Sequence, residues 1–229
     1  MKQLALDLGV RRAPTLDNFV AGANGELVVL LRAFAAGAGT ERFVYLWGEP
    51  GSGRSHLLEA VAAAAAARGA RACYLDAGAT RIEREALAAA ECIAIDNVEQ
   101  LDGAAQLALF GAYNALRAGG GALIASGPAA PAQLALRGDV VTRLAWGLVF
   151  RVHPLSDDDK AQALAQHAAG LGLRLPQEVI DYLLRHARRD LPALIAIIDG
   201  LDRFSLESKR PVTLPLLKEL LQETARAPG

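Results

Sequence analysis

The sequence predicts an α/β fold in which a parallel five-stranded sheet is flanked by helices and followed by a small all-helical C-terminal domain. Three observations support this fold. Short apolar runs alternate with helical or loop segments up to about residue 153, a glycine-rich loop joins the first run to a helix, and the strand signals end at Ser156. Such alternation is typical of a parallel sheet that helices cover on both faces.

The elements before Ser156 follow in chain order. An apolar stripe at helical spacing predicts a first helix and consists of Leu27, Leu30, Leu31 and Phe34. The runs that predict strands are Phe43–Trp47, 72–75, Cys92–Asp96, 122–126 and 148–152. A Leu- and Ala-rich helix over 55–67 follows the first strand. A further helical stripe, between the third and fourth strands, contains Leu107, Phe110, Ala115 and Leu116.

A helical domain begins near Pro154. Ser156 is a good N-cap, the acidic residues 157–159 favour the first helical turn, and the helix runs to about Ala169. Pro176 suits the first turn of the next helix. Apolar helical faces follow at Val179, Ile180, Leu183 and Leu184, at Leu194, Ile197, Ile198 and Leu201, and at Leu216, Leu217, Leu220 and Leu221.

The composition of the chain argues against several classes of protein. The chain has 229 residues, 52% of them hydrophobic, which is enough for a substantial core. A net charge of −1 and a pI near 6.4 argue against strong nonspecific duplex binding. No signal peptide or membrane span is predicted, since the alanine run 62–67 is short and lies close to Glu59 and Arg68. Cys73 and Cys92 lack metal-ligand spacing, as expected of core residues in a reduced cytoplasmic protein.

The most informative segment, 48–55, reads G-E-P-G-S-G-R-S and lies between the first strand and a helix. It matches the phosphate-binding pattern G-x-x-x-x-G-K-[ST], except that arginine replaces the lysine. Its glycines let backbone N–H groups approach phosphate oxygens, and the following helix adds positive potential. The residues expected to contact a nucleotide here are Gly48, Pro50, Gly51, Ser52, Gly53, Arg54, Ser55 and His56. The alternative is a glycine-rich turn that binds nothing.

Binding is predicted to be retained better than hydrolysis. Arg54 keeps the charge, but its planar fork does not place a point charge between phosphates as lysine does. Ser55 and Asp96, which ends the third strand, would hold Mg²⁺ at the sheet edge where α/β proteins bind ligands. Asn97 stands where related ATPases have an acidic residue that orients water, and Glu99 is a poorer candidate for that base. The alternative for Asp96 is a cap or turn residue.

Two further features point to partners. Arg143, just before the fifth strand, would act on phosphate across a subunit interface as an arginine finger, or would simply pack on Trp146. Near the N-terminus, alternating side chains suit an extended peptide docked in a partner's groove, or a strand packed on its own domain. They are Gln3, Leu4, Leu6 and Leu8.

These motifs together resemble the AAA+ family of the bacterial replication initiator DnaA, and within it the Hda group of regulators, which lack the initiator's C-terminal DNA-binding helices. The resemblance covers nearly the whole chain. It rests on five ordered segments: T-L-D-N-F-V from Thr15, F-V-Y-L-W-G-E-P-G-S-G-R-S-H-L-L from Phe43, C-I-A-I-D-N-V-E from Cys92, V-V-T-R-L-A-W-G from Val140 and P-L-S-D-D-D-K from Pro154.

The resemblance implies a sliding-clamp-binding peptide over 1–8, an AAA+ nucleotide-binding core over 15–153 and a helical lid over 154–229. It implies ADP or ATP with Mg²⁺, adenine near Asn18, Phe19 and Val20, and a first-sensor role for Ser126. It makes Arg143 an arginine finger that acts in trans on ATP bound to DnaA. The second-sensor arginine falls at Pro192, so that Arg189 or Arg188 would replace it.

The expected function is that of an adaptor which, bound to the DNA-loaded sliding clamp, promotes hydrolysis of ATP on DnaA and so prevents re-initiation of replication. DnaA, the clamp and further copies of the chain would be partners, with no membrane and only weak or indirect DNA contact. One alternative is a self-contained P-loop ATPase, which would require lysine at 54 and an acid at 97. Another is a DnaA-like DNA-binding initiation or helicase-loading factor, which would require a basic helix-turn-helix after Arg226 or a basic channel.

Overall fold

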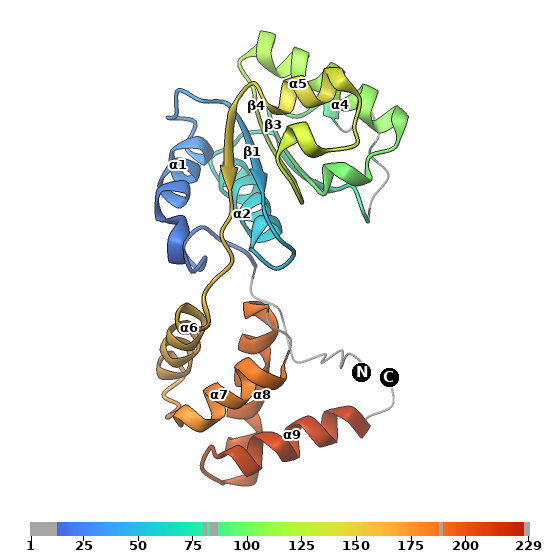
Figure 1. The fold of residues 1–229 in the computed structure, drawn as a ribbon. Coiled ribbons are helices and arrows are strands. Elements are labelled where there is room, and N and C mark those ends of the chain that lie inside the picture. Colours follow the sequence, from blue (N-terminus) through green and yellow to red (C-terminus); the bar gives the residue numbers. More distant parts are fainter. Residues whose placement is uncertain (1–12, 80–81, 83–86, 188–189, 227–229) are drawn as a thin grey trace. The chain divides into compact units, whose positions relative to one another are not determined.

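The computed structural model describes residues 13–79, 82, 87–187 and 190–226, with side chains placed up to residue 223. These residues form two compact units, one over 13–154 and the other from Leu155 onward. The first unit contains the sheet and the second contains only helices among its described residues (Figure 1). Each unit is described by itself below.

The sheet of the first unit has five parallel strands in the order β2-β3-β4-β1-β5. They are β1 Phe43–Trp47, β2 Ala72–Asp76, β3 Cys92–Asp96, β4 Ala122–Gly127 and β5 Leu148–Arg151. The predicted strands therefore all form, with ends that differ by at most one residue. Because all strands run the same way, the segments that follow β1, β2, β3 and β4 leave from one edge of the sheet, here called the carboxyl edge.

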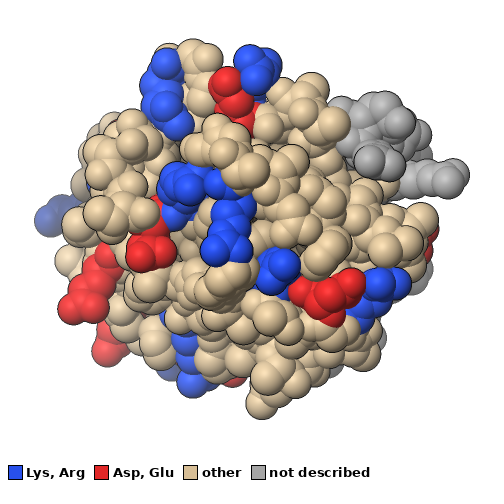
Figure 2. Space-filling view, turned by 90° about the horizontal axis from the view of Figure 1, so that it is seen from above, with Lys and Arg blue, Asp and Glu red and all other residues tan. Residues whose placement is uncertain are grey.

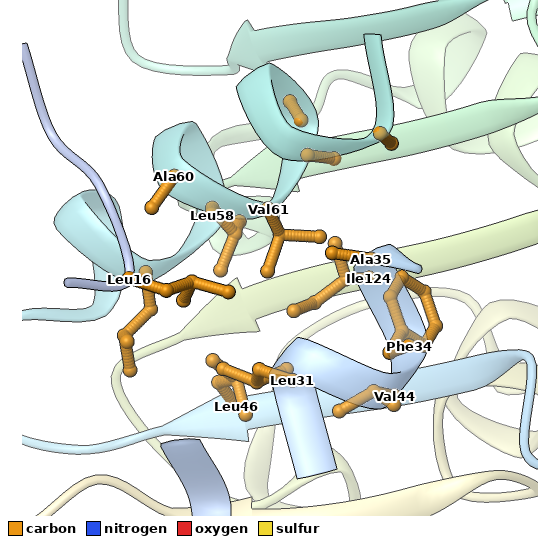
Figure 3. Close-up of a cluster of buried hydrophobic side chains, with 14 of the residues drawn as sticks. Leu16, Leu31, Phe34, Ala35, Val44, Leu46, Leu58, Ala60, Val61 and Ile124 are labelled. Carbon is orange, nitrogen blue, oxygen red and sulfur yellow. The ribbon is translucent and has the colours of Figure 1, made fainter. Parts of the chain in front are cut away.

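Helices cover both faces of this sheet (Figure 1). α1 (Gly25–Ala35) and α2 (Arg54–Ala67) pack on one face, and α4 (Gly103–Gly119) and α5 (Gly138–Leu144) pack on the other. Short 3₁₀ helices precede α1, α4 and α5 in the chain. They are η1 Gly22–Asn24, η2 Val98–Gln100 and η3 Pro131–Gln133. Figure 3 shows the first core, in which Leu31 and Phe34 from α1 and Leu58 and Val61 from α2 meet the apolar side of the sheet.

The apolar stripe predicted for α4 is partly wrong. Leu107 is 52% exposed and Ala115 is also exposed. The helix instead buries the face formed by Ala105, Gln106, Leu109, Ala112, Tyr113 and Leu116. Packing against the sheet decides which face is buried, and Asp102 marks the start of the helix, because its side chain accepts a hydrogen bond from the Ala105 N–H at 2.7 Å.

The second unit consists of α6 Asp157–Gly170, α7 Gln177–His186, α8 Leu191–Ser208 and α9 Leu214–Arg226. Ser156 and Asp159 form a reciprocal capping box at the start of α6, as the sequence indicates. Pro176 is the N-cap of α7 with an extended ψ of 145°, one position earlier than predicted. The predicted apolar faces form the core of this unit, where Leu164, Leu183, Leu194 and Leu216 are fully buried. The predicted fold class is thereby confirmed.

Candidate functional site

The phosphate loop 48–55 leaves the carboxyl edge of β1 and enters α2. Gly53 is the N-cap of α2 with φ 98°, in the left-handed region that favours glycine. A Cβ on Gly53 would come within 2.7 Å of the Phe19 ring, and a Cβ on Gly48 within 2.5 Å of the Val152 carbonyl oxygen. Both positions therefore admit only glycine without rearrangement, so the loop has the shape that the sequence pattern predicts.

Two polar atoms of this loop lack partners. Within the described residues, Ser52 Oγ and Arg54 Nη1 are buried and make no hydrogen bond. Buried polar groups are almost always satisfied, and two orphans beside one helix N-terminus suit an anion with several acceptor oxygens. Ser55, in the first turn of α2, is exposed beside them. These residues fit a nucleotide phosphate chain.

The charges of Arg54 and Glu99 both act on the hydroxyl group of Tyr45. Burial raises the pKa of Tyr45, the Glu99 carboxylate raises it further, and the Arg54 guanidinium opposes the rise. Tyr45 donates its hydroxyl to the Ala129 carbonyl oxygen at 2.9 Å. Glu99, which is exposed, and Arg54 therefore act in opposite directions on the pKa of the same hydroxyl.

Asp96, at the carboxyl end of β3, is 1% exposed. Its Oδ1 accepts hydrogen bonds from the Ser126 hydroxyl and, at 3.0 Å, from the Asn97 N–H. Its Oδ2 accepts one from the Tyr74 hydroxyl at 3.2 Å, and burial, reinforced by the Asp96 charge, raises the pKa of Tyr74. Three donors suit an ionised carboxylate, and they hold it at the edge from which the phosphate loop leaves.

The pairing of the strands relates Asp96 to the loop. Ser126 lies on β4, between β3 and β1, and is the register partner of Leu46. Two strand spacings separate β3 from β1, which is roughly 10 Å. Ser126, which donates to Asp96, thus lies on the strand between Asp96 and the strand that leads into the phosphate loop.

Asn97 occupies the sequence position at which a second acid would orient water, but its side chain binds Asp76 on β2. It adopts a left-handed φ of 55°, and its Nδ2 donates to Asp76 Oδ1 at 2.8 Å. Sequence reasoning missed Tyr74 and Asp76, both on β2. Asp76 ends an apolar strand as Asp96 does, whereas the sequence prediction ends that strand at Leu75.

The segment that the resemblance places at the adenine packs against the start of α2. The Phe19 and His56 rings lie 5.4 Å apart, and His56 Nε2 lies 2.9 Å from the Thr15 carbonyl oxygen. Asn18 is exposed and fixes its own loop, exchanging hydrogen bonds with Thr15 at 2.9 Å and 3.1 Å. Val20 is half-buried. The structure thus brings Phe19 and His56 to the phosphate loop, whereas the Asn18 side chain has a local structural role.

Arg143 lies at the opposite edge of the sheet. It is in the last turn of α5, and β5 starts four residues beyond Leu144 with Leu148 paired to Val44, near the amino end of β1. Its Nε donates to Asn114 Oδ1 at 3.3 Å. Its Cζ lies 5.0 to 5.7 Å from three aromatic ring centroids, those of Phe110, Tyr113 and Trp146.

Arg143 therefore packs on Trp146, which is the alternative that the sequence left open. This packing leaves Arg143 half-buried and does not bring it to the phosphate loop of its own chain. β1 has five residues with a rise of about 3.3 Å each, so the carboxyl and amino edges of the sheet lie roughly 15 Å apart. A second arginine, Arg117, stacks on the same indole with Cζ 3.7 Å from the ring centroid.

Several predicted residues lie outside the described part of the chain. They are Gln3, Leu4, Leu6, Leu8, Arg188 and Arg189. Pro192, at the second-sensor position, lies in the first turn of α8 and is tolerated there because the first turn needs no N–H donor.

Among the residues that the structure describes, no group of three His, Cys, Asp or Glu side chains is arranged to hold a metal ion. None of the described helices is long and apolar enough to cross a membrane. On the face shown in Figure 2, Lys and Arg side chains are interspersed with Asp, Glu and uncharged surface.

Solved structures share this fold. Domain III of the DnaA protein of Thermotoga maritima matches with a TM-score of 0.75 and 20% identity, over 96% of this chain and 100% of that chain. AMPPCP-bound DnaA from Aquifex aeolicus matches with a TM-score of 0.70 and 21% identity, over 96% of this chain and 71% of that chain. Protein NMB1076 from Neisseria meningitidis is 37% identical over 67% of this chain and 100% of that chain, with a TM-score of 0.46.

Two family models divide the chain between them. The model described as "Hda, lid domain" matches residues 157–221, which are the helices of the second unit. The model of the bacterial DnaA ATPase domain matches residues 10–151, which include the sheet, the phosphate loop and Asp96. Since this second match spans more than half of its length, the chain belongs to the DnaA-related AAA+ family.

Proposed function

We propose that this chain is a nucleotide-binding AAA+ adaptor that, bound to the DNA-loaded sliding clamp, promotes hydrolysis of ATP held by DnaA and so prevents re-initiation of replication. One observation carries the proposal. Arg143 is a cation held among aromatic rings at the sheet edge opposite its own phosphate loop, roughly 15 Å away along β1. An arginine in that place suits the nucleotide of a neighbouring subunit better than its own.

The chain's own nucleotide would have a structural role. Backbone N–H groups of Gly51 and Gly53 with the Arg54 guanidinium would hold its phosphates, Ser55 and Asp96 would hold Mg²⁺, and Phe19 would lie near the adenine. AMPPCP in the Aquifex DnaA structure and the two orphan polar atoms support a bound adenine nucleotide, ADP or ATP. When bound, the magnesium nucleotide supplies charge that stabilises this edge of the sheet.

Two side chains indicate that the chain itself would hydrolyse ATP only weakly. Arg54 replaces the lysine of the phosphate loop, and Asn97 directs its amide to Asp76 rather than serving as a base. Arg143 would instead stabilise the negative charge that develops on the γ-phosphate of ATP on DnaA, as arginine fingers do. The N-terminal peptide with Gln3, Leu4, Leu6 and Leu8 would bind the clamp, and Arg189 would complete the nucleotide contacts from the lid.

The experiment follows hydrolysis of radiolabelled ATP pre-bound to DnaA, in the presence of clamp-loaded DNA. Because a finger arginine is worth about 10³-fold or more in rate, Arg143→Ala should abolish the stimulation while leaving ADP binding by the chain unchanged. Arg117→Ala is the matched control, since it removes an arginine from the same Trp146 ring. Equal stimulation by the Arg143→Ala variant and the parent would refute the mechanism, and steady ATP turnover by the isolated chain would favour a self-contained ATPase.

A further inference from the structure

Strand β2 carries none of the site residues predicted from the sequence, yet its last residue is connected to Asp96. The Cα atoms of Asp76 and Asp96 are register partners across β2 and β3. Asn97 joins the two carboxylates, because its side chain donates to Asp76 at 2.8 Å and its backbone N–H donates to Asp96 at 3.0 Å. One neutral residue therefore bridges two acids at the carboxyl edge.

The backbone of Asn97 makes this bridge possible. Its φ of 55° is in the left-handed region, which costs energy for residues other than glycine but is tolerated best by Asn and Asp. From this conformation the chain enters η2 at Val98. Asp76 Oδ1 is the acceptor that holds the Asn97 amide on the β2 side.

Asp76 is itself held firmly. Its Oδ1 also accepts a hydrogen bond from the Gly78 N–H at 2.9 Å, and the Ala77 N–H donates to the Asp96 carbonyl oxygen at 3.1 Å. The turn after β2 also lies against η2, since a Cβ on Gly78 would come within 2.7 Å of Gln100 Oε1. The acceptor that Asn97 uses is thus held by contacts that do not involve the Asn97 side chain.

We infer that Asp76 is a positioning residue for Asp96. Through Asn97 it fixes the N–H group that orients the Asp96 carboxylate, and so prepares that carboxylate to hold the cation of a bound nucleotide. The inference rests on the proposed function, in which Asp96 is a magnesium ligand. Groups that orient a metal ligand from outside typically contribute 10- to 100-fold to metal affinity. The same geometry accounts for the missing second acid, because a carboxylate at 97 would meet that of Asp76.

The test measures binding of a fluorescent ADP derivative by the full chain, once with EDTA and once in a magnesium titration. Asp76→Ala should weaken the apparent magnesium affinity at least tenfold and leave ADP binding in EDTA unchanged. Asp76→Asn keeps an acceptor oxygen for Asn97 and should stay within about threefold of the parent. Asp102→Ala is the matched control: it removes the cap hydrogen bond of α4 and should lower the unfolding midpoint without changing the magnesium dependence.

Two results would overturn the inference. One is parental magnesium affinity in Asp76→Ala, and the other is an equal loss of ADP binding with and without magnesium, which would indicate a purely structural role. Failure of the parent chain to bind ADP under any condition would refute the proposed function and this inference together. Parental binding with an unaffected Asp76→Ala variant would refute the inference alone.

Discussion

Asp96 shows how one buried carboxylate is oriented by neighbours on two other strands and by the residue that follows it. Ser126 donates from β4, Tyr74 from β2, and Asn97 from the residue that follows Asp96 itself. A buried carboxylate without such donors would leave its oxygens without partners, at a large desolvation cost. The fold thus holds the Asp96 carboxylate in a fixed orientation at the sheet edge from which the phosphate loop leaves.

Gly53 gives a residue-scale prediction. Gly53→Ala should lower ADP affinity at least tenfold, because the added methyl group would lie 2.7 Å from the Phe19 ring as well as straining a φ of 98°. Gly69→Ala is the control at the other end of α2: its φ is 94°, but no atom lies within 4 Å of the added Cβ. In urea denaturation both substitutions should lose about 1 kcal/mol to backbone strain, Gly53→Ala should lose more through its contact with Phe19, and only Gly53→Ala should impair binding. Equal ADP affinity in the two variants would contradict this assignment of Phe19.

At the scale of elements, the sequence was most informative where periodicity decides the structure. The apolar runs located all five strands within a residue, and Ser156 located the start of α6. The stripe of α4 was partly wrong, because Leu107 and Ala115 are exposed and packing against the sheet decides which face is buried. Periodicity alone did not carry that information.

The site could be predicted in part for the same reason. The sequence pattern predicted the phosphate loop, which follows β1 directly, and Asp96, which is the last residue of β3. It did not reveal that Asp76 would meet Asn97, because the residues are 21 positions apart and only the β2–β3 register joins them. The surroundings of Arg143 likewise come from α4, with Asn114 29 positions earlier in the chain.

The capping box of α6 gives an element-scale prediction. Ser156→Ala should destabilise the chain by about 1 kcal/mol at pH 7, because it removes the acceptor for the Asp159 N–H at 3.0 Å. Hydrogen bonds from the Ser156 side chain and backbone lower the pKa of Asp159. A lowered folded-state pKa means that this contribution is present above the ordinary aspartate pKa and is lost as pH falls through the folded value.

The measurement is urea denaturation of the parent and variant between pH 7 and pH 3, with amide hydrogen exchange at the first turn of α6. The stability difference should shrink in the acid range. Asp158→Ala is the control, since Asp158 lies in the same turn without taking part in the capping box. A stability difference that stays constant from pH 7 to pH 3 would show that the Asp159 charge does not contribute.

At the scale of the whole molecule, the core places the two proposed functions at opposite ends of its strands. The carboxyl edge carries the phosphate loop and Asp96, and the amino edge carries Arg143 with its aromatic neighbours. Such an arrangement suits head-to-tail association, in which the amino edge of one subunit faces the nucleotide of the next. The near-neutral charge of −1 agrees with assembly through specific contacts and not through a general attraction to DNA.

The last prediction concerns the N-terminal peptide, which lies outside the described residues. Tethering a protein beside its partner raises its effective concentration to the order of mM, far above the concentrations at which the free proteins would meet in an assay. Deleting residues 1–8 should therefore reduce clamp-dependent hydrolysis of DnaA-bound ATP to the level measured without clamp, about 10²-fold lower, and leave ADP binding by the core unchanged. Substituting Gln3 and Leu6 by alanine tests the peptide without shortening the chain, and Lys2→Ala is the matched control. Full stimulation by the shortened chain on clamp-loaded DNA would show that another surface makes the clamp contact, while Arg143 would retain its assigned role.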